Sequence, residues 1–183
     1  MKGHGKTCLA RRIAEQAPRV VVLDPKEDFG GGVVLSEGAD IWPWLYEARN
    51  GSKFSAILRP TTAEDEAAFW AATRPKKKGG FLENCLIVLD EIDMWAKPEK
   101  SHPDLHSLIQ YGRHQSISLL GTCRRSANTS RNFTSQCNDI AAFRNEEPAD
   151  IKHLSNYMDT AGIQDLQPGE FIQREDAEML RGI

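Results

Sequence analysis

The sequence predicts an α/β protein in which a mainly parallel sheet lies between layers of helices. Short aliphatic runs alternate along the chain with longer amphipathic stretches, and the aliphatic runs are continuous rather than alternating with polar residues. Continuous apolar strands separated by helices are typical of a parallel sheet buried on both faces. The strands expected on this basis are Val20–Leu23, Phe54–Leu58, Cys85–Leu89, Ile117–Gly121, Ile140–Phe143 and Glu170–Gln173. The expected helices are Lys6–Gln16, Ala63–Thr73, Pro103–Tyr111 and Pro148–Tyr157.

The composition is that of an ordinary globular protein. With 183 residues, the chain is expected to form a single domain over residues 1–183. Its 40% hydrophobic and 27% charged residues exclude a disordered, collagen-like or disulfide-scaffold protein. The net charge of -3 means that any contact with nucleic acid has to come from local basic patches. No apolar run approaches the ~20 residues that span a bilayer, so we expect a soluble, cytoplasmic protein without a membrane span.

A phosphate-binding loop is the first candidate site. Gly5-Lys6-Thr7 matches the end of the motif GxxxxGK[ST] and directly precedes an amphipathic stretch. The first glycine of the motif would stand one residue before Met1, and no strand precedes the loop in the sequence. We therefore expect a domain truncated at this loop, with a native chain that is longer by at least one strand.

The residue types of this loop fit the chemistry of a nucleoside triphosphate. Backbone N–H groups of Gly3, His4, Gly5, Lys6, Thr7 and Cys8 would converge on phosphate oxygens at a helix N-terminus. Lys6 would reach the β- and γ-phosphates, and the Thr7 hydroxyl would ligate Mg²⁺. Taken alone, Gly-Lys-Thr is equally compatible with a helix start that carries a basic residue.

An acidic strand end supplies the second half of the site. The run Leu86–Leu89 is followed by two carboxylates, Asp90 and Glu91, in the pattern of a Walker B motif with an added glutamate. Asp90 would hold Mg²⁺, and Glu91 would polarise the water that attacks the γ-phosphate. An acidic surface turn is the alternative, but the pairing with Gly5-Lys6-Thr7 favours ATP hydrolysis. No [NT]KxD motif for guanine is present.

Three further residues are candidates for catalysis. Thr122 follows the expected strand Ile117–Gly121, where a polar side chain would contact the γ-phosphate or the attacking water; a threonine that satisfies a turn is the alternative. Arg113 could act on a neighbouring subunit's nucleotide as an arginine finger, or simply stabilise a helix C-terminus. Arg124 is a rival for the finger role.

The order of these motifs resembles the FtsK–HerA superfamily of P-loop ATPases of the ASCE type, particularly the small genome-packaging ATPases of viruses and phages. Filamentous-phage assembly ATPases share this core but carry a membrane span. The matching segments are Gly5-Lys6-Thr7, Val22-Leu23-Asp24-Pro25-Lys26, Ile87-Val88-Leu89-Asp90-Glu91, Gly112-Arg113-His114, Thr122 with Arg124, Asp139–Arg144, Glu147-Pro148-Ala149-Asp150 and Pro168-Gly169-Glu170-Phe171-Ile172. The chain departs from the family at Cys123-Arg124, where a glutamine is common.

The resemblance implies a P-loop NTPase three-layer sandwich that lacks its first strand. It further implies a homo-oligomeric ring, a hexamer or a similar number of subunits, that binds ATP and Mg²⁺ and moves double-stranded DNA, with a capsid or portal protein as a possible partner. Two alternatives remain open: an ATPase that drives virion assembly or secretion without DNA in its pore, and a nucleotide-binding scaffold with little turnover.

A DNA translocase would need basic loops that contact the backbone without reading sequence. One candidate is Lys76-Lys77-Lys78, which is followed by Gly79-Gly80; the other is the segment that carries Arg124, Arg125 and Arg131. A charge run can also be no more than a solvated loop. We expect Trp42, Trp44, Trp70 and Trp95 to serve in the core or at interfaces rather than to stack on bases.

Overall fold

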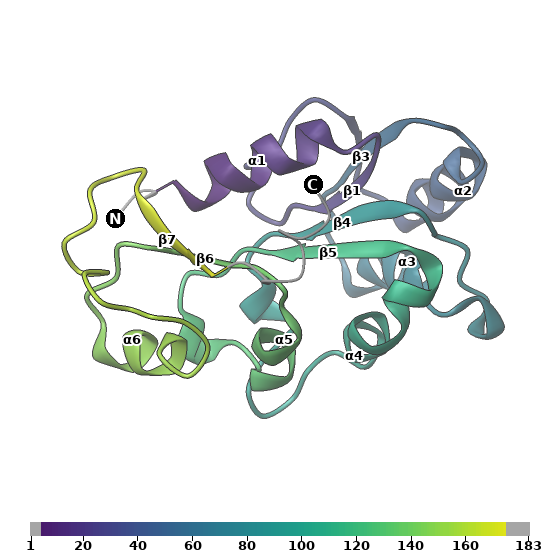
Figure 1. Cartoon of the computed structure of the whole chain (residues 1–183). Helices are drawn as coiled ribbons and strands as arrows, with labels where there is room; N and C mark the ends of the chain where they lie inside the picture. Colours follow the sequence, from purple (N-terminus) through teal and green to yellow (C-terminus); the bar gives the residue numbers. More distant parts are fainter. Residues whose placement is uncertain (1–4, 175–183) are drawn as a thin grey trace.

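The computed structural model describes residues 5–174, which form a five-stranded parallel sheet with helices on both faces (Figure 1). The strand order is β2-β3-β1-β4-β5, and in the centre of the sheet Val22 lies beside Ile57 on one side and Val88 on the other. Among the described residues, no strand pairs with the outer edge of β5. The strands of this sheet are β1 (Arg19–Leu23), β2 (Val33–Leu35), β3 (Phe54–Leu58), β4 (Cys85–Leu89) and β5 (Ile117–Gly121).

Side chains of the central strands alternate between two apolar layers. In β1, Val20 and Val22 pack against the helix on one face, whereas Val21 and Leu23 join the larger core under the other helices. Figure 1 shows α1 on one side of the sheet and α3 and α4 on the other. This arrangement confirms the predicted three-layer α/β sandwich. The helices are α1 (Lys6–Gln16), α2 (Gly38–Ala48), α3 (Ala63–Thr73) and α4 (Pro103–Tyr111).

The last third of the chain forms a second, smaller sheet. Strands β6 (Ile140–Phe143) and β7 (Phe171–Arg174) pair antiparallel, so that Phe143 lies opposite Phe171. The predictions of Ile140–Phe143 and Glu170–Gln173 as strands are correct to within a residue, but their place in the parallel sheet is wrong. The reason is a separate apolar cluster around Ala142, Leu154 and Ile163, which gives this pair its own core. Two short helices, α5 (Arg131–Gln136) and α6 (Pro148–Leu154), accompany it.

Three elements were not expected from the sequence, and one helix is shorter than predicted. Strand β2 has only three residues, two of them exposed, and α5 has six, so neither has a clear periodic pattern. Helix α2 contains Pro43, which normally argues against a helix interior. Helix α6 ends at Leu154 rather than Tyr157, because the Asn156 side chain bonds the Lys152 and His153 carbonyls.

The tryptophans divide between core and surface. Trp70 and Trp95 are buried, and both indole N–H groups donate to Glu66 Oε1, at 2.6 Å and 2.7 Å. Trp44 is partly buried, whereas Trp42 is exposed on α2 and stacks on Tyr46. The longest helices within residues 5–174 have 11 residues, and none of them is long and apolar enough to cross a membrane.

Candidate functional site

The candidate site lies at the carboxyl ends of β1, β4 and β5, which is the edge where ligands bind in parallel α/β sheets. Residues from the start of α1 approach the same edge. The positive charge of Lys6 acts on Cys123, directly after Thr122, where it opposes the effect of burial that raises the pKa of this thiol. This effect links Lys6 to the end of β5, and the union of the phosphate loop and the acidic strand end in one site stays a prediction.

The N-terminus of α1 has the properties of an anion site. Gly5 is its N-cap, with φ of 109°, and a Cβ added there would lie 2.9 Å from Phe143 Cε1, so both the backbone and the available space require glycine. No side chain caps this helix, and its first turn holds no acidic residue. The first N–H groups thus retain their affinity for a bound anion.

The remaining residues of the predicted loop are only partly described. Lys6 and Thr7 are half-buried at the start of α1, and Cys8 is exposed. Gly3 and His4 lie outside the described residues, so their predicted contacts with phosphate stay a prediction. An uncapped helix start with a glycine at its tip and a lysine in its first turn fits a nucleotide's phosphates.

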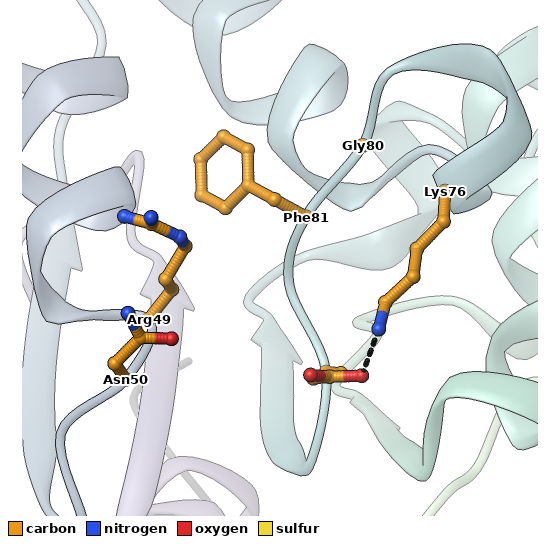
Figure 2. Close-up of a pocket in the computed structure, with 6 residues that line it drawn as sticks. Arg49, Asn50, Lys76, Gly80 and Phe81 are labelled. Carbon is orange, nitrogen blue, oxygen red and sulfur yellow. Dashed lines mark ion pairs between the residues drawn. The ribbon is translucent and has the colours of Figure 1, made fainter.

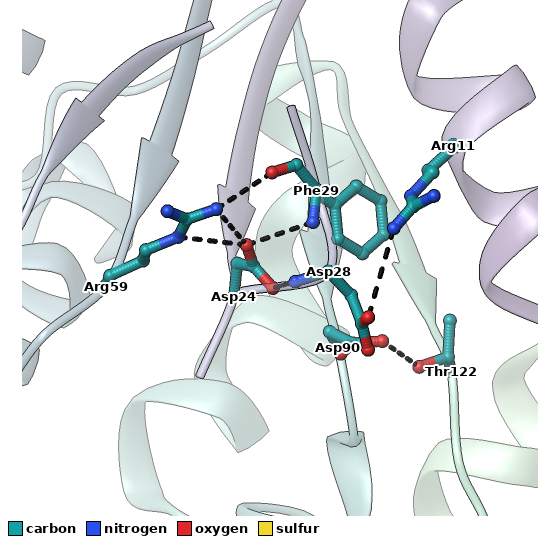
Figure 3. A network of polar contacts seen from close by, with 7 residues as sticks. All are labelled: Arg11, Asp24, Asp28, Phe29, Arg59, Asp90 and Thr122. Carbon is teal, nitrogen blue, oxygen red and sulfur yellow. Dashed lines mark hydrogen bonds and ion pairs between the residues drawn. The ribbon is translucent and has the colours of Figure 1, made fainter. Parts of the chain in front are cut away.

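Thr122 links the two strand ends that flank the site. Its hydroxyl donates to Asp90 Oδ1 over 2.6 Å and accepts the backbone N–H of Glu91 over 3.1 Å. Its own N–H donates to the Leu89 carbonyl. The threonine thus satisfies a turn, as the alternative interpretation expected, and at the same time holds the Asp90 carboxylate and the Glu91 backbone. Figure 3 shows the Thr122 side chain turned toward Asp90.

The electrostatics around Asp90 favour a bound cation. Burial raises the pKa of Asp90, and the negative charges of Asp24, Asp28 and Glu91 raise it further, whereas the hydrogen bond from Thr122 opposes the shift. A divalent cation at this carboxylate would relieve the repulsion among the four acidic groups, and hard cations such as Mg²⁺ prefer oxygen ligands of this kind. Asp90 is thus an oxygen ligand of the kind that Mg²⁺ prefers, and the joint binding of such an ion by Asp90 and Thr7 stays a prediction.

Glu91 has an unusual backbone conformation. Its φ of 55° and ψ of 54° place it in the left-handed region, which a non-glycine residue adopts at a cost of roughly 1–3 kcal/mol. The side chain is half-buried, and its Oε2 lies 3.8 Å from Lys26 Nζ. Backbone strain of this kind clusters at functional sites, which supports a functional role for this glutamate.

A second polar network braces the loop after β1, and sequence reasoning missed it. Asp24 is fully buried and accepts hydrogen bonds from the backbone N–H groups of Asp28 and Phe29. Arg59 donates to the same carboxylate at 3.1 Å and to the Phe29 carbonyl at 2.9 Å (Figure 3). One signal in the sequence could have revealed this network. Arg59 directly follows β3 just as Asp24 directly follows β1, and the two strands are neighbours in the parallel sheet.

The same loop also contacts α1. The guanidinium of Arg11 lies 3.9 Å from Asp28 and over the ring of Phe29, and Figure 3 shows it turned from the helix toward the loop. Helix α1, which follows the phosphate loop, is thereby joined to the loop after β1 on one side of the site. Nothing in the sequence pattern pointed to Arg11.

The candidate arginines lie in different places. Arg113 is exposed in the 3-10 helix Gly112–Gln115, which precedes β5 and so lies at the sheet edge opposite the site. Arg124 is exposed two residues after Thr122, at the same edge as the site. Arg125 instead pairs with the buried carboxylate of Asp150 at 2.8 Å, which is a structural role. The finger assignment therefore stays a prediction for Arg113 and Arg124.

The lysine loop also lies at the opposite edge. Residues Lys76–Lys78 form a 3-10 helix ahead of β4, and two of the lysines have partners within the chain. Lys76 pairs with Glu83 at 2.5 Å, and Lys77 lies over the Tyr111 ring. Figure 2 shows Lys76 beside a shallow pocket that Arg49 and Phe81 also line. These contacts favour the solvated-loop interpretation for the lysines.

Comparison with solved structures reveals a shared fold. The solved structures that resemble this chain include viral genome-packaging NTPases, the kind of protein that the FtsK–HerA resemblance predicts. No protein-family profile matches the sequence, and no curated protein matches it either.

Two of these structures are the genome-packaging NTPase B204 from Sulfolobus turreted icosahedral virus 2 in complex with ATP-gammaS, and B204, the DNA-packaging ATPase from Sulfolobus Turreted Icosahedral Virus. The first superposes with a TM-score of 0.71 and 16% sequence identity, covering 97% of this chain and 89% of the other. The second gives 0.68 and 17%, covering 96% and 88%. Likeness at this identity establishes a common fold.

Proposed function

We propose that the chain is an ATP-hydrolysing motor that translocates double-stranded DNA, as in the packaging of a phage or viral genome. The observation that carries this proposal is the Thr122 hydroxyl between Asp90 and Glu91, at the sheet edge where the uncapped α1 begins. The same fold occurs in genome-packaging NTPases solved with ATP-gammaS and with AMPPCP. A nucleotide at this edge would account for the uncapped start of α1 and for the left-handed backbone of Glu91, which a structural role leaves unexplained.

Each residue has a distinct task in the proposed reaction. Lys6 and the N–H groups of α1 bind the phosphates; Asp90 and Thr7 would hold an Mg²⁺ ion, which would supply charge stabilisation to the phosphoryl group. Glu91, the residue after Asp90, orients the attacking water and accepts its proton. Thr122 holds the Asp90 carboxylate and the backbone of Glu91. An arginine, Arg113 or Arg124, completes the site from a neighbouring subunit of a ring.

Duplex DNA would pass along exposed arginines that follow β5. Arg124 and Arg131 are both exposed, and neither forms an ion pair within residues 5–174. Contacts of this kind bind phosphates without reading sequence, which suits a motor that must accept a whole genome. A capsid or portal protein is the partner that a packaging role would require.

Steady-state ATP hydrolysis with and without duplex DNA tests the proposal. We expect hydrolysis to rise several-fold with duplex DNA and to fall as salt weakens the phosphate contacts. Lys6→Ala is expected to abolish nucleotide binding, whereas Glu91→Gln should bind ATP but not hydrolyse it. The matched control is Lys152→Met, which removes an exposed charge on α6.

Three results would redirect the assignment. Hydrolysis at equal rates with and without DNA would favour an ATPase that drives assembly or secretion. Tight ATP binding without turnover in the wild type would favour a nucleotide-binding scaffold. An active Glu91→Gln variant would remove Glu91 from the catalytic role.

A further inference from the structure

We propose that the amino edge of the parallel sheet, opposite the candidate site, is a docking surface for an acidic segment of another protein that also carries apolar side chains. This amino-edge surface has an aromatic centre, formed by Trp42, Tyr46 and Phe81, and a basic rim on the connections that lead from helices into strands. The proposal goes beyond the ATPase function, because docking here needs neither nucleotide binding nor hydrolysis.

The aromatic centre joins α2 to the connection before β4. Trp42 and Tyr46 stack one turn apart on α2, with ring centroids 5.1 Å apart, and the Phe81 ring stands perpendicular to both, at 5.3 Å and 5.2 Å. Although the three rings pack together, Trp42 and Tyr46 remain 39% and 41% exposed. Adjoining exposed aromatic side chains mark interaction sites, and Trp and Tyr often dominate the binding energy of protein interfaces.

Positive charge is concentrated at the same edge. The whole chain has a net charge of -3, yet the connections into β3, β4 and β5 hold a single carboxylate, Glu83. Apart from Arg74, which pairs with Asp104 of α4, the basic residues of these connections are Arg49, Lys53, Lys76, Lys77, Lys78 and Arg113. A surface of one charge sign attracts and orients a partner of the opposite sign. The segment that docks here should therefore be acidic.

The basic rim and the aromatic centre form one surface. The Arg49 guanidinium lies 3.4 Å from the centre of the Tyr46 ring, and within residues 5–174 neither Arg49 nor Lys78 forms an ion pair. Arg49 and Phe81 line the same shallow pocket of about 260 Å³, which has room for one apolar side chain of a partner (Figure 2). An apolar side chain in this pocket would place neighbouring carboxylates beside the rim.

The ring contacts favour a protein over a nucleic acid as the occupant. Single-stranded nucleic acids bind by stacking bases on free aromatic faces. Trp42 covers one face of Tyr46 and Arg49 covers the other, because two planar groups cannot share one face of a ring, so no face of Tyr46 is left for a base. Two of the rim lysines are already engaged, Lys76 with Glu83 and Lys77 over a ring, which weakens the surface for duplex phosphates. An aromatic centre with an arginine and a charged rim is typical of protein interfaces.

Fluorescence anisotropy with a short labelled peptide, in which Asp and Glu residues flank a central Leu and Phe, tests the proposal. We expect saturable binding to the wild type that weakens as salt rises, and binding at least tenfold weaker for a peptide with Asn and Gln in place of the acids. Trp42→Ala should weaken the acidic peptide at least tenfold. Arg49→Met and Lys78→Met should each weaken it about two- to fivefold, as the loss of one exposed ion pair allows.

Lys152→Met, which removes an exposed charge on α6, is the matched control and should leave the Kd unchanged. Circular dichroism of each variant checks the fold. Lys78 is exposed and outside the aromatic centre, so Lys78→Met keeps the test valid if Trp42→Ala does not fold.

Three results would overturn the proposal. A single-stranded or duplex oligonucleotide that binds more tightly than the peptide at equal salt, and is weakened by the same variants, would identify a nucleic-acid surface. Self-association in sedimentation velocity that Trp42→Ala and Arg49→Met abolish would identify an interface between copies of this chain. Absence of saturable peptide binding, or equal binding by the wild type, Arg49→Met and Lys78→Met, would refute the docking surface itself. Because these measurements are made without ATP, their outcome is independent of the ATPase function.

Discussion

The Thr122 hydroxyl donates to Asp90 Oδ1 over 2.6 Å and so ties the end of β5 to the end of β4. The two residues are 32 positions apart in the chain, yet the parallel register of β4 and β5 brings them together, with Leu89 beside Gly121. The same hydroxyl accepts the Glu91 N–H. One oxygen atom therefore holds both the Asp90 carboxylate and the Glu91 backbone.

Thr122→Val should lower both activity and stability. Valine keeps the shape but leaves Asp90 and the Glu91 N–H without this partner, and an unsatisfied buried group costs about 1–3 kcal/mol. Urea unfolding and ATP hydrolysis measure the two effects. Thr122→Ser retains the hydroxyl and is the matched control; equal activity in the two variants would exclude a role for the hydroxyl.

Arg59→Met should destabilise the fold strongly. It would leave the fully buried Asp24 carboxylate without its cation, and breaking a buried pair on one side costs about 3–5 kcal/mol. The double variant Asp24→Asn with Arg59→Met removes the stranded charge and should recover part of that loss in urea unfolding. A double variant no more stable than Arg59→Met would mean that charge is not the cause.

A mixing experiment tests whether Arg113 acts across subunits. Arg113→Ala subunits retain their own Glu91, and Glu91→Gln subunits can lend Arg113 to a neighbour. Mixed rings should therefore hydrolyse ATP faster than either variant alone, as a coupled-enzyme assay would record. Arg124→Ala serves as the parallel test, and if neither mixture gains activity, the finger acts within one subunit or is absent.

The stability that Asp65 contributes should be lost in acid. Hydrogen bonds to its carboxylate from the Gly38 N–H, the Thr61 hydroxyl and the Thr62 N–H lower the pKa of Asp65 from 3.8 to about 2. Because the folded pKa is below the unfolded one, this contribution is complete above about pH 4 and fades as the pH falls toward about 2. Asp65→Asn should thus be less stable than wild type at neutral pH.

Urea unfolding at several pH values measures this effect, and the difference between wild type and Asp65→Asn should shrink below about pH 4. Glu64→Gln, in the same first turn of α3, controls for the general loss of a negative charge near the helix N-terminus. A difference between wild type and Asp65→Asn that stays constant down to about pH 2 would contradict the assignment.

The sequence predicted the sheet and the strand-end residues because both leave local signals. Asp90, Glu91 and Thr122 each follow a strand directly, and parallel strands gather their carboxyl ends at one edge. Helix α2 escaped prediction because Pro43 interrupts its pattern and tertiary packing against α3 stabilises it. The separate sheet of β6 and β7 escaped because pairing partners 28 to 34 residues apart leave no local trace.

Within the site, the residues that the sequence predicted belong to recognisable motifs. The residues that it did not predict act through tertiary contacts. Arg59 and Arg11 reach the loop after β1 from β3 and α1, and neither stands in a pattern that indicates its partner. The pairing of Lys26 with Glu91 also depends on the parallel register of β1 and β4, in which Leu23 lies beside Leu89.

The glycine at the tip of α1 has a consequence for how a movement of this helix would reach the small sheet of β6 and β7. Because a single added carbon at Gly5 would collide with the Phe143 ring, there is no room for a side chain between the helix tip and β6. Phe143 pairs with Phe171 across the small sheet, and close-packed groups transmit displacement rather than absorb it. A ligand that displaced the helix tip toward β6 would therefore press on the Phe143 ring and, through it, on the antiparallel pair of β6 and β7.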